Sequence, residues 1–253
     1  MIYIKNSTEI EKMYLASQIV ARMHKELRNL IKPGITTSEI DKFCEQFIRS
    51  QGGIPAQIGY QGYPFATCTS VNDVICHGFP SNQVLKSGDL ITVDTVVEYD
   101  GYMGDSAWSY KVGEVSDEIS KLMNVTKECL YLGIKEAVIG NRIGDIGHVI
   151  QENAESNGFS VVREFTGHGI GKSMHEDPMV LHYGKKGRGV RLQEGMVITI
   201  EPMINTGVWN SKIDEDGWTA RTKDGGISCQ YEHTLAITKE GPKVLTVQEG
   251  EII

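Results

Sequence analysis

One aspartate of this sequence sits inside an apolar strand, and a second faces the same way across a turn. Asp94 lies within the β-branched run 91–97, where an unpaired buried carboxylate would cost several kcal/mol. Asp100-Gly101 follows the run and is a strong signal for a two-residue hairpin turn. That turn pairs Asp94 with Ala107, so Asp94 and Asp105 become diagonal neighbours on one face, about 7–8 Å apart at the backbone. Two carboxylates at this distance repel each other unless cations lie between them.

A second pair of strand-borne acids and one unusual histidine lie further along the chain. Glu201 follows the apolar segment 196–200 and is stopped by Pro202, and Glu232 lies inside the strand-like segment 227–237. His168 stands in the glycine-rich segment 166–171. Glycines on both sides are expected to let the backbone turn sharply and to leave the imidazole accessible.

Together these residues form a hard, oxygen-rich set of four carboxylates and one imidazole. Such a set suits Mn, Fe(II), Co or Zn in a paired site better than a tetrahedral structural zinc. Two ions about 3.5–4 Å apart need bridging carboxylates, which this set supplies. Considered singly, each of the four acids would be interpreted as an exposed strand residue or as a partner in an ion pair. His168 considered singly would be interpreted as an ordinary loop histidine. Their joint occurrence predicts a centre with two divalent ions.

Helices and strands that could position these residues follow from the apolar spacing. Helices are expected over residues 8–30, 37–50, 117–138 and 145–157, and strands over 90–98, 102–111, 160–165, 196–200, 228–237 and 243–246. Thr8 and Glu11 fit a capping box at the first helix. The second helix pair weakly repeats the first, since Gly34 aligns with Gly140. We therefore expect an α+β protein with a single catalytic domain, 1–253, built from halves of about 1–112 and 113–253 that share one core.

Composition excludes several other classes of protein. The chain has 253 residues, 40% of them hydrophobic and 23% charged, with a formal net charge of -8. Its densest basic run, 185–188, is short and lies in a glycine-rich turn, so no nucleic-acid partner is expected. Five cysteines without a C-x-x-C pair argue against a disulfide framework and a cysteine-based zinc finger. No signal-peptide core or membrane-length apolar run is present, so we expect a cytoplasmic protein with no membrane partner.

The combined motifs resemble those of the type I methionine aminopeptidases over almost the whole chain. The motifs are Asp94 with Asp105, Gly167-His168-Gly169-Ile170-Gly171 with His175-Glu176, Ile200-Glu201-Pro202, and Gln230-Tyr231-Glu232-His233-Thr234. The resemblance implies the pita-bread fold, in which two pseudo-symmetric halves of helices pack on a curved antiparallel sheet. It also implies removal of the initiator methionine from nascent polypeptides near the ribosome, with a preference for a small second residue, by a monomeric enzyme.

By the same resemblance, each member of the acid set acquires a role. Asp105 and Glu232 would bridge the two metals, Asp94 would complete one ion, and His168 and Glu201 would complete the other. Glu201 would also accept a proton from the attacking water.

The resemblance also implies residues that contact the substrate. His175 would hold the scissile carbonyl, and His77 would face the amide nitrogen that is released. The methionine side chain would lie among Tyr60, Tyr63, Cys68, Met174 and Trp218. A structural monovalent cation, Na or K, would be held at Asn72, Val74 and Ser228. Met174 stands where an aromatic residue is common and Gln57 where a cysteine often occurs, so the shape of the pocket departs from the usual pattern.

Two other functions remain open from the sequence. A proline-directed peptidase, such as an Xaa-Pro aminopeptidase or a prolidase, shares the fold, but usually carries an extra N-terminal domain. A metal-free binding module of the same fold would be expected to lose several ligand positions, whereas all five are filled here. Among the remaining histidines, His24 and His148 are expected at the surface or its boundary, and His182 in a structural role.

Overall fold

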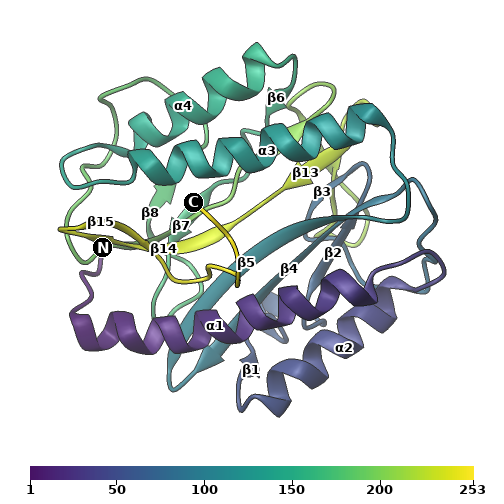
Figure 1. The fold of residues 1–253 in the computed structure, drawn as a ribbon, viewed down its shortest axis with the longest axis horizontal. Helices are drawn as coiled ribbons and strands as arrows, with labels where there is room; N and C mark the ends of the chain where they lie inside the picture. The colour runs from purple at the N-terminus through teal and green to yellow at the C-terminus, as the bar shows by residue number, and fades with distance from the viewer.

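Four helices lie in two pairs on one side of a set of antiparallel sheets (Figure 1). The computed structural model describes all residues, 1–253. The helices are α1 (Ser7–Leu30), α2 (Thr37–Ser50), α3 (Asp117–Glu136) and α4 (Ile143–Ser156). Helix α1 packs beside α2 and α3 beside α4. The expected bounds are confirmed for α2 and shift by up to two residues at the ends of the others.

The start of α1 differs from the expected capping box at Thr8 and Glu11. The side chain of Asn6 accepts a hydrogen bond from the backbone N–H of Glu9, and the Glu9 carboxylate accepts one from the backbone N–H of Asn6. Asn6 has extended backbone angles, which the residue before a helix needs, and asparagine is a stronger N-cap than threonine. The helix therefore begins one residue earlier than the sequence pattern suggested.

A long hairpin carries the two aspartates. Its strands are β4 (Leu90–Tyr99) and β5 (Tyr102–Lys111). Asp100 and Gly101 form the turn with φ values of 51° and 76°, and Asp94 pairs with Ala107, as predicted. The short strands β1 (Ile54–Pro55) and β2 (Cys68–Val71) pair with β4 along its other edge.

The second half of the chain forms a five-stranded sheet in the order β15-β14-β9-β7-β8. Its strands are β7 (Gly167–Gly169), β8 (Glu176–Val180), β9 (Val197–Ile200), β14 (His233–Thr238) and β15 (Gly241–Val244). Two small sheets complete the molecule, from β6 (Ser160–Val161), β10 (Met203–Asn205) and β13 (Ser228–Gln230), and from β3 (Val74–Cys76), β11 (Ser211–Ile213) and β12 (Ala220–Thr222).

The prediction of one continuous strand over 228–237 is wrong. Strand β13 ends at Gln230 and β14 begins at His233, and the two strands belong to different sheets. Between them the backbone N–H of Glu232 donates to the carbonyl oxygen of Ala107 over 2.8 Å. The chain therefore changes sheets at the point where it reaches β5. The expected strand 160–165 likewise ends at Val161.

The two halves are joined along a seam between β5 and the segment that starts β14. The hydroxyl of Ser106 donates to the carbonyl oxygen of Glu232 over 2.8 Å. The hydroxyl of Thr234 donates to the carbonyl oxygen of Asp105, also over 2.8 Å. These bonds fix Asp105 and Glu232 next to each other although 126 positions separate Ser106 from Glu232 in the chain.

The helices cover this framework closely. At Gly104 a Cβ atom would lie 2.5 Å from the backbone nitrogen of Ser17, so only glycine lets α1 approach β5 this far. A continuous cluster of 40 buried hydrophobic residues draws on all four helices. None of the helices combines the length and apolarity needed to cross a bilayer.

The expectation that His24 lies at the surface is wrong. Its side chain is fully buried, its Nε2 lies 3.1 Å from the carbonyl oxygen of Ser106, and its Nδ1 lies 2.7 Å from the hydroxyl of Tyr110. A neutral imidazole with its proton on Nε2 satisfies both partners. His24 therefore helps α1 to hold β5 in place. The expectation for His148, by contrast, is confirmed, since 40% of its side chain is exposed.

Candidate metal centre

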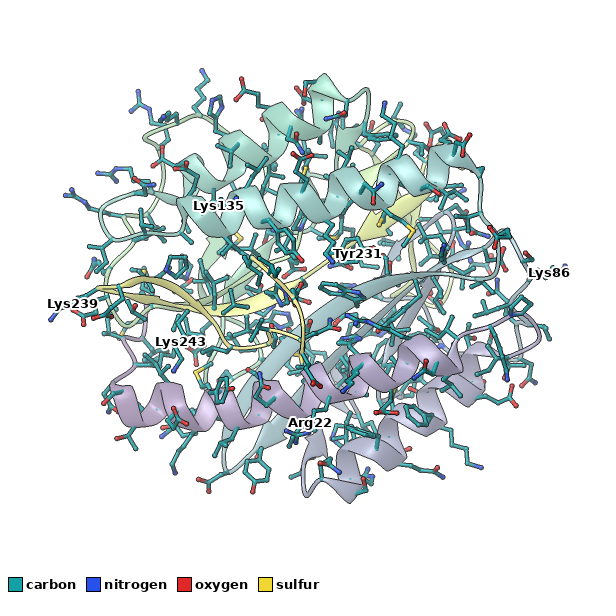
Figure 2. All side chains as sticks on the ribbon, viewed as in Figure 1. Arg22, Lys86, Lys135, Tyr231, Lys239 and Lys243 are labelled. Atoms are coloured by element: carbon teal, nitrogen blue, oxygen red, sulfur yellow. The ribbon has the colours of Figure 1, made fainter.

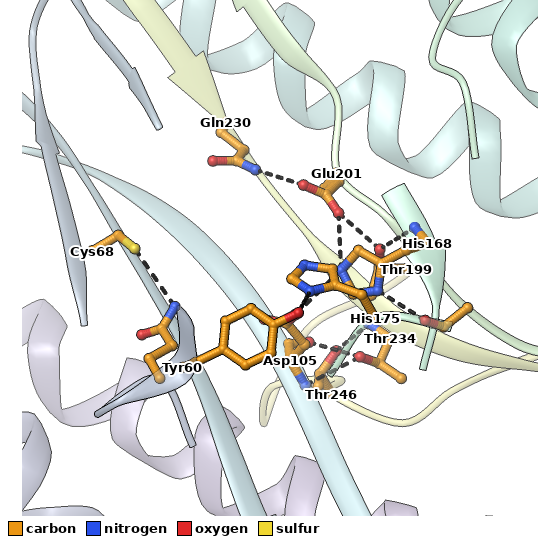
Figure 3. A network of polar contacts seen from close by, with 12 residues as sticks. Tyr60, Cys68, Asp105, His168, His175, Thr199, Glu201, Gln230, Thr234 and Thr246 are labelled. Carbon is orange, nitrogen blue, oxygen red and sulfur yellow. Dashed lines mark hydrogen bonds and ion pairs between the residues drawn. The ribbon is translucent and has the colours of Figure 1, made fainter. Parts of the chain in front are cut away.

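The five predicted metal ligands converge on one cavity of about 330 Å³. Asp94 and Asp105 reach it from the first hairpin, His168 from β7, and Glu201 and Glu232 from the ends of β9 and β13. Figure 3 shows Asp105, His168 and Glu201 of this set. Ligand atoms of Asp105, His168 and Glu232 lie within 4.8 Å of one another. Residues that are far apart in sequence are thus brought together with their donor atoms facing a common space.

The imidazole of His168 is oriented for ligation. Its Nδ1 lies 2.9 Å from the carbonyl oxygen of Gly169, which is positioned to accept the Nδ1 proton. This bond leaves Nε2 as the free donor atom, the arrangement usual for a metal-bound histidine. Nε2 lies 3.6 Å from Asp105 Oδ2 and 3.6 Å from Glu201 Oε1. Donor atoms that share one ion lie roughly 3–4 Å apart, so these separations suit a cation between them.

The glycines beside His168 do not form the sharp turn that was expected from the sequence. Gly167 and Gly169 lie in β7, and neither has a positive φ. A Cβ atom at Gly167 would lie 2.5 Å from the carbonyl oxygen of Thr199, and one at Gly169 would lie 2.2 Å from that of Asp177. The glycines therefore let β7 approach its neighbours closely, and that approach places the imidazole over the acids.

The electrostatics of the carboxylates indicate that cations belong among them. Burial raises the pKa of Asp94 to about 7 and that of Glu201 to about 8. Burial and then the neighbouring carboxylates raise the pKa values of Asp105 and Glu232 well above the usual range. One oxygen each of Asp94, Asp105 and Glu232 is buried without a hydrogen-bond partner. Unpaired buried oxygens with strong mutual repulsion fit divalent ions, which would supply the missing partners.

Two residues that sequence reasoning missed hold the carboxylate of Glu201. The hydroxyl of Thr199 donates to Oε1 over 2.8 Å, and the side-chain amide of Gln230 donates to Oε2 over 3.2 Å (Figure 3). Thr199 also accepts a hydrogen bond from the backbone N–H of His168 over 3.0 Å. Strand alternation could have found both, because each lies two residues before a predicted ligand, Glu201 or Glu232, and so on the same face.

The two histidines predicted to contact the substrate line the same cavity. His175 Nδ1 lies 2.7 Å from the hydroxyl of Tyr60. His77 has a φ of 57°, a conformation that a residue other than glycine seldom adopts. Burial lowers the pKa of both histidines, that of His77 to about 4 with added repulsion from His175. Both side chains are therefore neutral at physiological pH and can donate hydrogen bonds.

Aromatic and sulfur-containing residues form another part of the wall of this cavity. The ring of Tyr63 packs edge-on against the ring of Trp218, with 5.1 Å between centroids. Met174 is 5% exposed and Cys68 2% exposed, and both line the cavity. Gln57 donates to the sulfur of Cys68 over 3.5 Å. Sequence reasoning missed Phe165, whose ring lies 5.4 Å from that of His77, because its segment was assigned to a strand.

The residues expected to hold a monovalent cation lie together where β13 meets β3. The backbone N–H of Ser228 donates to the carbonyl oxygen of Asn72 over 2.9 Å. Asn72 has a φ of 53°, and the hydroxyl of Ser228 is buried without a partner. An oxygen-rich corner of this kind can accept a small cation, and Val74 lies at the start of the adjacent strand.

Comparison with known proteins identifies relatives over the full length of the chain. The sequence model of metallopeptidase family M24 matches residues 11–239. Methionine aminopeptidase A of Synechocystis sp. is 49% identical, with 98% of each chain covered. The methionine aminopeptidase of Clostridium acetobutylicum is 48% identical over 98% of this chain and 100% of its own.

Solved structures extend the comparison to the fold. The methionine aminopeptidase of Rickettsia prowazekii matches with a TM-score of 0.96 and 41% identity, covering 98% of this chain and 100% of its own. A prolidase from Pyrococcus furiosus matches with a TM-score of 0.77 and 24% identity, covering 97% of this chain and 66% of its own. The latter likeness concerns the fold alone. The expected α+β pita-bread architecture is confirmed.

Proposed function

The chain belongs to metallopeptidase family M24, and from that premise we propose that it removes the initiator methionine from new polypeptides. The observation that carries the proposal is the near-complete coverage by relatives named methionine aminopeptidase at 48–49% identity. The donor set supports it, since the five ligand side chains line one cavity beside an apolar pocket. The sequence identity to the prolidase is 24%, half of the identity to these methionine aminopeptidases. The proline-directed alternative is therefore not favoured.

The metal content that we propose is two divalent ions, Co, Mn, Fe(II) or Zn. Asp105 and Glu232 would serve both ions, Asp94 one, and His168 and Glu201 the other. When bound, such ions act as Lewis acids and lower the pKa of water toward neutrality. The buried, unpaired oxygens of Asp94, Asp105 and Glu232 are the structural support for this assignment.

Glu201 is the proposed proton acceptor. The hydroxyl of Thr199 and the amide of Gln230 bind one carboxylate oxygen each, so the group cannot rotate freely. A divalent ion beside it would keep Glu201 in the carboxylate form, and a carboxylate held in this way can accept a proton from an attacking water. The same carboxylate can then deliver a proton to the amine that leaves.

His175 is the proposed donor to the scissile carbonyl. With the Tyr60 hydroxyl donating to Nδ1, the ring proton lies on Nε2, which faces the cavity as a neutral donor. A donor of this kind stabilises the negative charge that develops on the carbonyl oxygen. His77, whose ring packs against those of Phe165 and Trp218, would contact the amide nitrogen.

The apolar end of the cavity accounts for the choice of methionine. An unbranched thioether can enter the slot beside Tyr63, Trp218 and Cys68 and gain sulfur–aromatic contact worth about 0.3–1.5 kcal/mol. A charged first residue would enter without a partner. The second residue would lie beside His77 and Phe165, whose rings leave little space, so glycine, alanine or serine is expected there.

The remaining expectations belong to the same proposal. The enzyme would act as a monomer on nascent N-termini in the cytoplasm, near the ribosome, without nucleic-acid or membrane partners. A Na or K ion would bind at the corner of Asn72, Val74 and Ser228. The unpaired hydroxyl of Ser228 supports that cation.

A peptide panel tests the function. The chelator-treated enzyme is assayed with Met-Ala-Ser, Met-Leu-Ser, Lys-Ala-Ser and Ala-Pro-Phe after addition of Mn, Co, Fe(II) or Zn. We expect high kcat/KM for Met-Ala-Ser only, with two ions bound per chain by elemental analysis. Preferential cleavage of Ala-Pro-Phe would instead support the proline-directed peptidase, and metal binding without cleavage of any peptide would contradict both.

A further inference from the structure

A second hollow, of about 540 Å³, lies between α1, α3 and the end of β5. It shares no residue with the cavity of the metal centre. Tyr231 lines this hollow, although the adjacent Glu232 lines the metal cavity, because neighbouring residues of an extended chain point to opposite faces. Figure 2 shows Tyr231 in the space between α3 and β5. The hollow is therefore separate from the metal centre, although Tyr231 of the hollow and Glu232 of the centre are consecutive residues.

The charge of this hollow is opposite to that of the molecule. Arg28, Lys111 and Lys127 line it, and none of its ten lining residues is an aspartate or a glutamate. The chain as a whole carries a formal net charge of -8. None of the three cations forms an ion pair with a carboxylate. Three unpaired cations facing one space attract an anion.

The ammonium group of Lys127 lies over two aromatic rings. Its Nζ lies 4.8 Å from the ring centroid of Trp108 and 5.5 Å from that of Tyr131. Burial lowers the pKa of Lys127, the nearby carboxylate of Glu251 opposes this effect, and Arg28 adds a smaller lowering. Glu251 is already engaged, since its Oε1 lies 2.6 Å from the Tyr131 hydroxyl and 3.3 Å from His233 Nε2. Arg28 donates a hydrogen bond to the neutral side-chain oxygen of Gln248, so neither Arg28 nor Lys127 has a carboxylate in direct contact.

Neutral donors complete the lining. The side chain of Tyr231 is 5% exposed, and its hydroxyl has no hydrogen-bond partner in the protein. Ser120 and Asn124 lie on the turns of α3 that precede Lys127. A guanidinium, two ammonium groups and neutral hydroxyl and amide donors match the several acceptor oxygens of a phosphate group.

We propose that this hollow binds a small phosphate-bearing anion, such as inorganic pyrophosphate or the diphosphate of a nucleotide. Its volume lies within the range of pockets for ligands of nucleotide size. The oxyanion would lie between Arg28 and Lys127, with Lys111 at the rim and the Tyr231 hydroxyl at the floor. The site is distinct from the proposed aminopeptidase activity and does not depend on it.

The test is a calorimetric titration of the full chain with pyrophosphate, ADP and adenosine. The protein is first treated with a chelator, so that the anions cannot bind to ions of the metal centre, and the titration is then repeated with metal restored. We expect pyrophosphate and ADP to bind and adenosine not to bind. Binding should weaken about tenfold or more in Arg28→Gln and in Lys127→Gln, because each removes a charge-assisted hydrogen bond.

Matched controls lie on the same two helices. Arg22 on α1 and Lys135 on α3 are both labelled in Figure 2, and neither lines the hollow. Arg22→Gln and Lys135→Gln should therefore keep the wild-type affinity. All four variants should cleave Met-Ala-Ser at the wild-type rate, which separates this site from the metal centre.

Two outcomes would overturn the proposal. One is the absence of pyrophosphate and ADP binding to the wild-type chain. The other is equal affinity in the wild type, Arg28→Gln and Lys127→Gln, which would place the anion elsewhere. Lys111→Gln, at the exposed end of β5, provides a third variant with little risk to folding, and its affinity must also fall.

Discussion

The backbone N–H of Glu201 donates a hydrogen bond to Nε2 of His182 over 3.0 Å. His182 is buried, and burial lowers its pKa to about 3, so the ring is neutral and carries its proton on Nδ1. The bond fixes the backbone of Glu201, while Thr199 and Gln230 hold its carboxylate. His182 therefore positions the proposed proton acceptor without itself lining the metal cavity.

Replacement of His182 by alanine should lower kcat about 10- to 100-fold, because a small misplacement of the proton acceptor is costly. KM and the bound metal content should stay close to the wild-type values. The measurement is steady-state kinetics on Met-Ala-Ser with elemental analysis of the same samples. His148→Ala, at an exposed helix position, is the control. A wild-type kcat in His182→Ala would show that the bond has no part in positioning Glu201.

Asp105→Ala should abolish activity and loosen both ions, because one carboxylate is proposed to serve both. Elemental analysis after dialysis should find fewer than one tightly bound ion per chain. Glu98→Ala removes another acid of the same hairpin, one that does not line the cavity, and should change neither metal content nor rate. Retention of two ions with near-normal turnover in Asp105→Ala would contradict the assignment.

His175→Ala should keep its metals and lose about 10²–10³-fold in kcat, the usual cost of one donor to a developing oxyanion. Tyr60→Phe should lose less, because it removes only the hydroxyl that lies 2.7 Å from His175 Nδ1. Comparison of kcat and metal content in the two variants checks this order. Loss of an ion from His175→Ala would make the histidine a ligand instead.

The pH dependence of stability should report on His24. Burial lowers its pKa from 6.5 in the unfolded chain to about 4, so the unfolded chain binds a proton between those values that the folded chain does not. Stability is therefore lost as pH falls from 6.5 toward 4, at about 1.4 kcal/mol per unit, or roughly 2 kcal/mol at pH 5. Urea unfolding at pH 7.5 and pH 5 measures the difference.

His24→Gln should show a smaller loss of stability between those two pH values, although it is less stable overall. His148→Gln, which alters an exposed side chain, should follow the wild type. An unchanged difference between pH 7.5 and pH 5 in His24→Gln would mean that the acid sensitivity arises from the other buried histidines.

Local signals were sufficient to predict the first hairpin and the residues that it brings together. Asp100-Gly101 determines both the turn and the register, and the register places Asp94 and Asp105 on one face. The four helices were similarly evident, because an apolar stripe repeats over 14 residues or more in each. In these segments the backbone conformation depends mainly on residues close in sequence.

Contacts between distant segments explain what the sequence did not reveal. The break between β13 and β14 depends on a hydrogen bond from Glu232 to Ala107, and no local pattern marks it. The burial of His24 depends on Ser106 and Tyr110, and the glycines beside His168 are required by strands that come later in the chain. Thr199 and Gln230 matter only because the fold directs Glu201 between them.

The seam between β5 and β14 also makes the chain suitable for division into two fragments. The loop of residues 113–116, between β5 and α3, is largely exposed. A cut there would leave Asp94 and Asp105 on one fragment and His168, Glu201 and Glu232 on the other. Neither fragment could assemble the full set of donors alone. Peptidase activity would therefore require the two fragments to associate again along the seam.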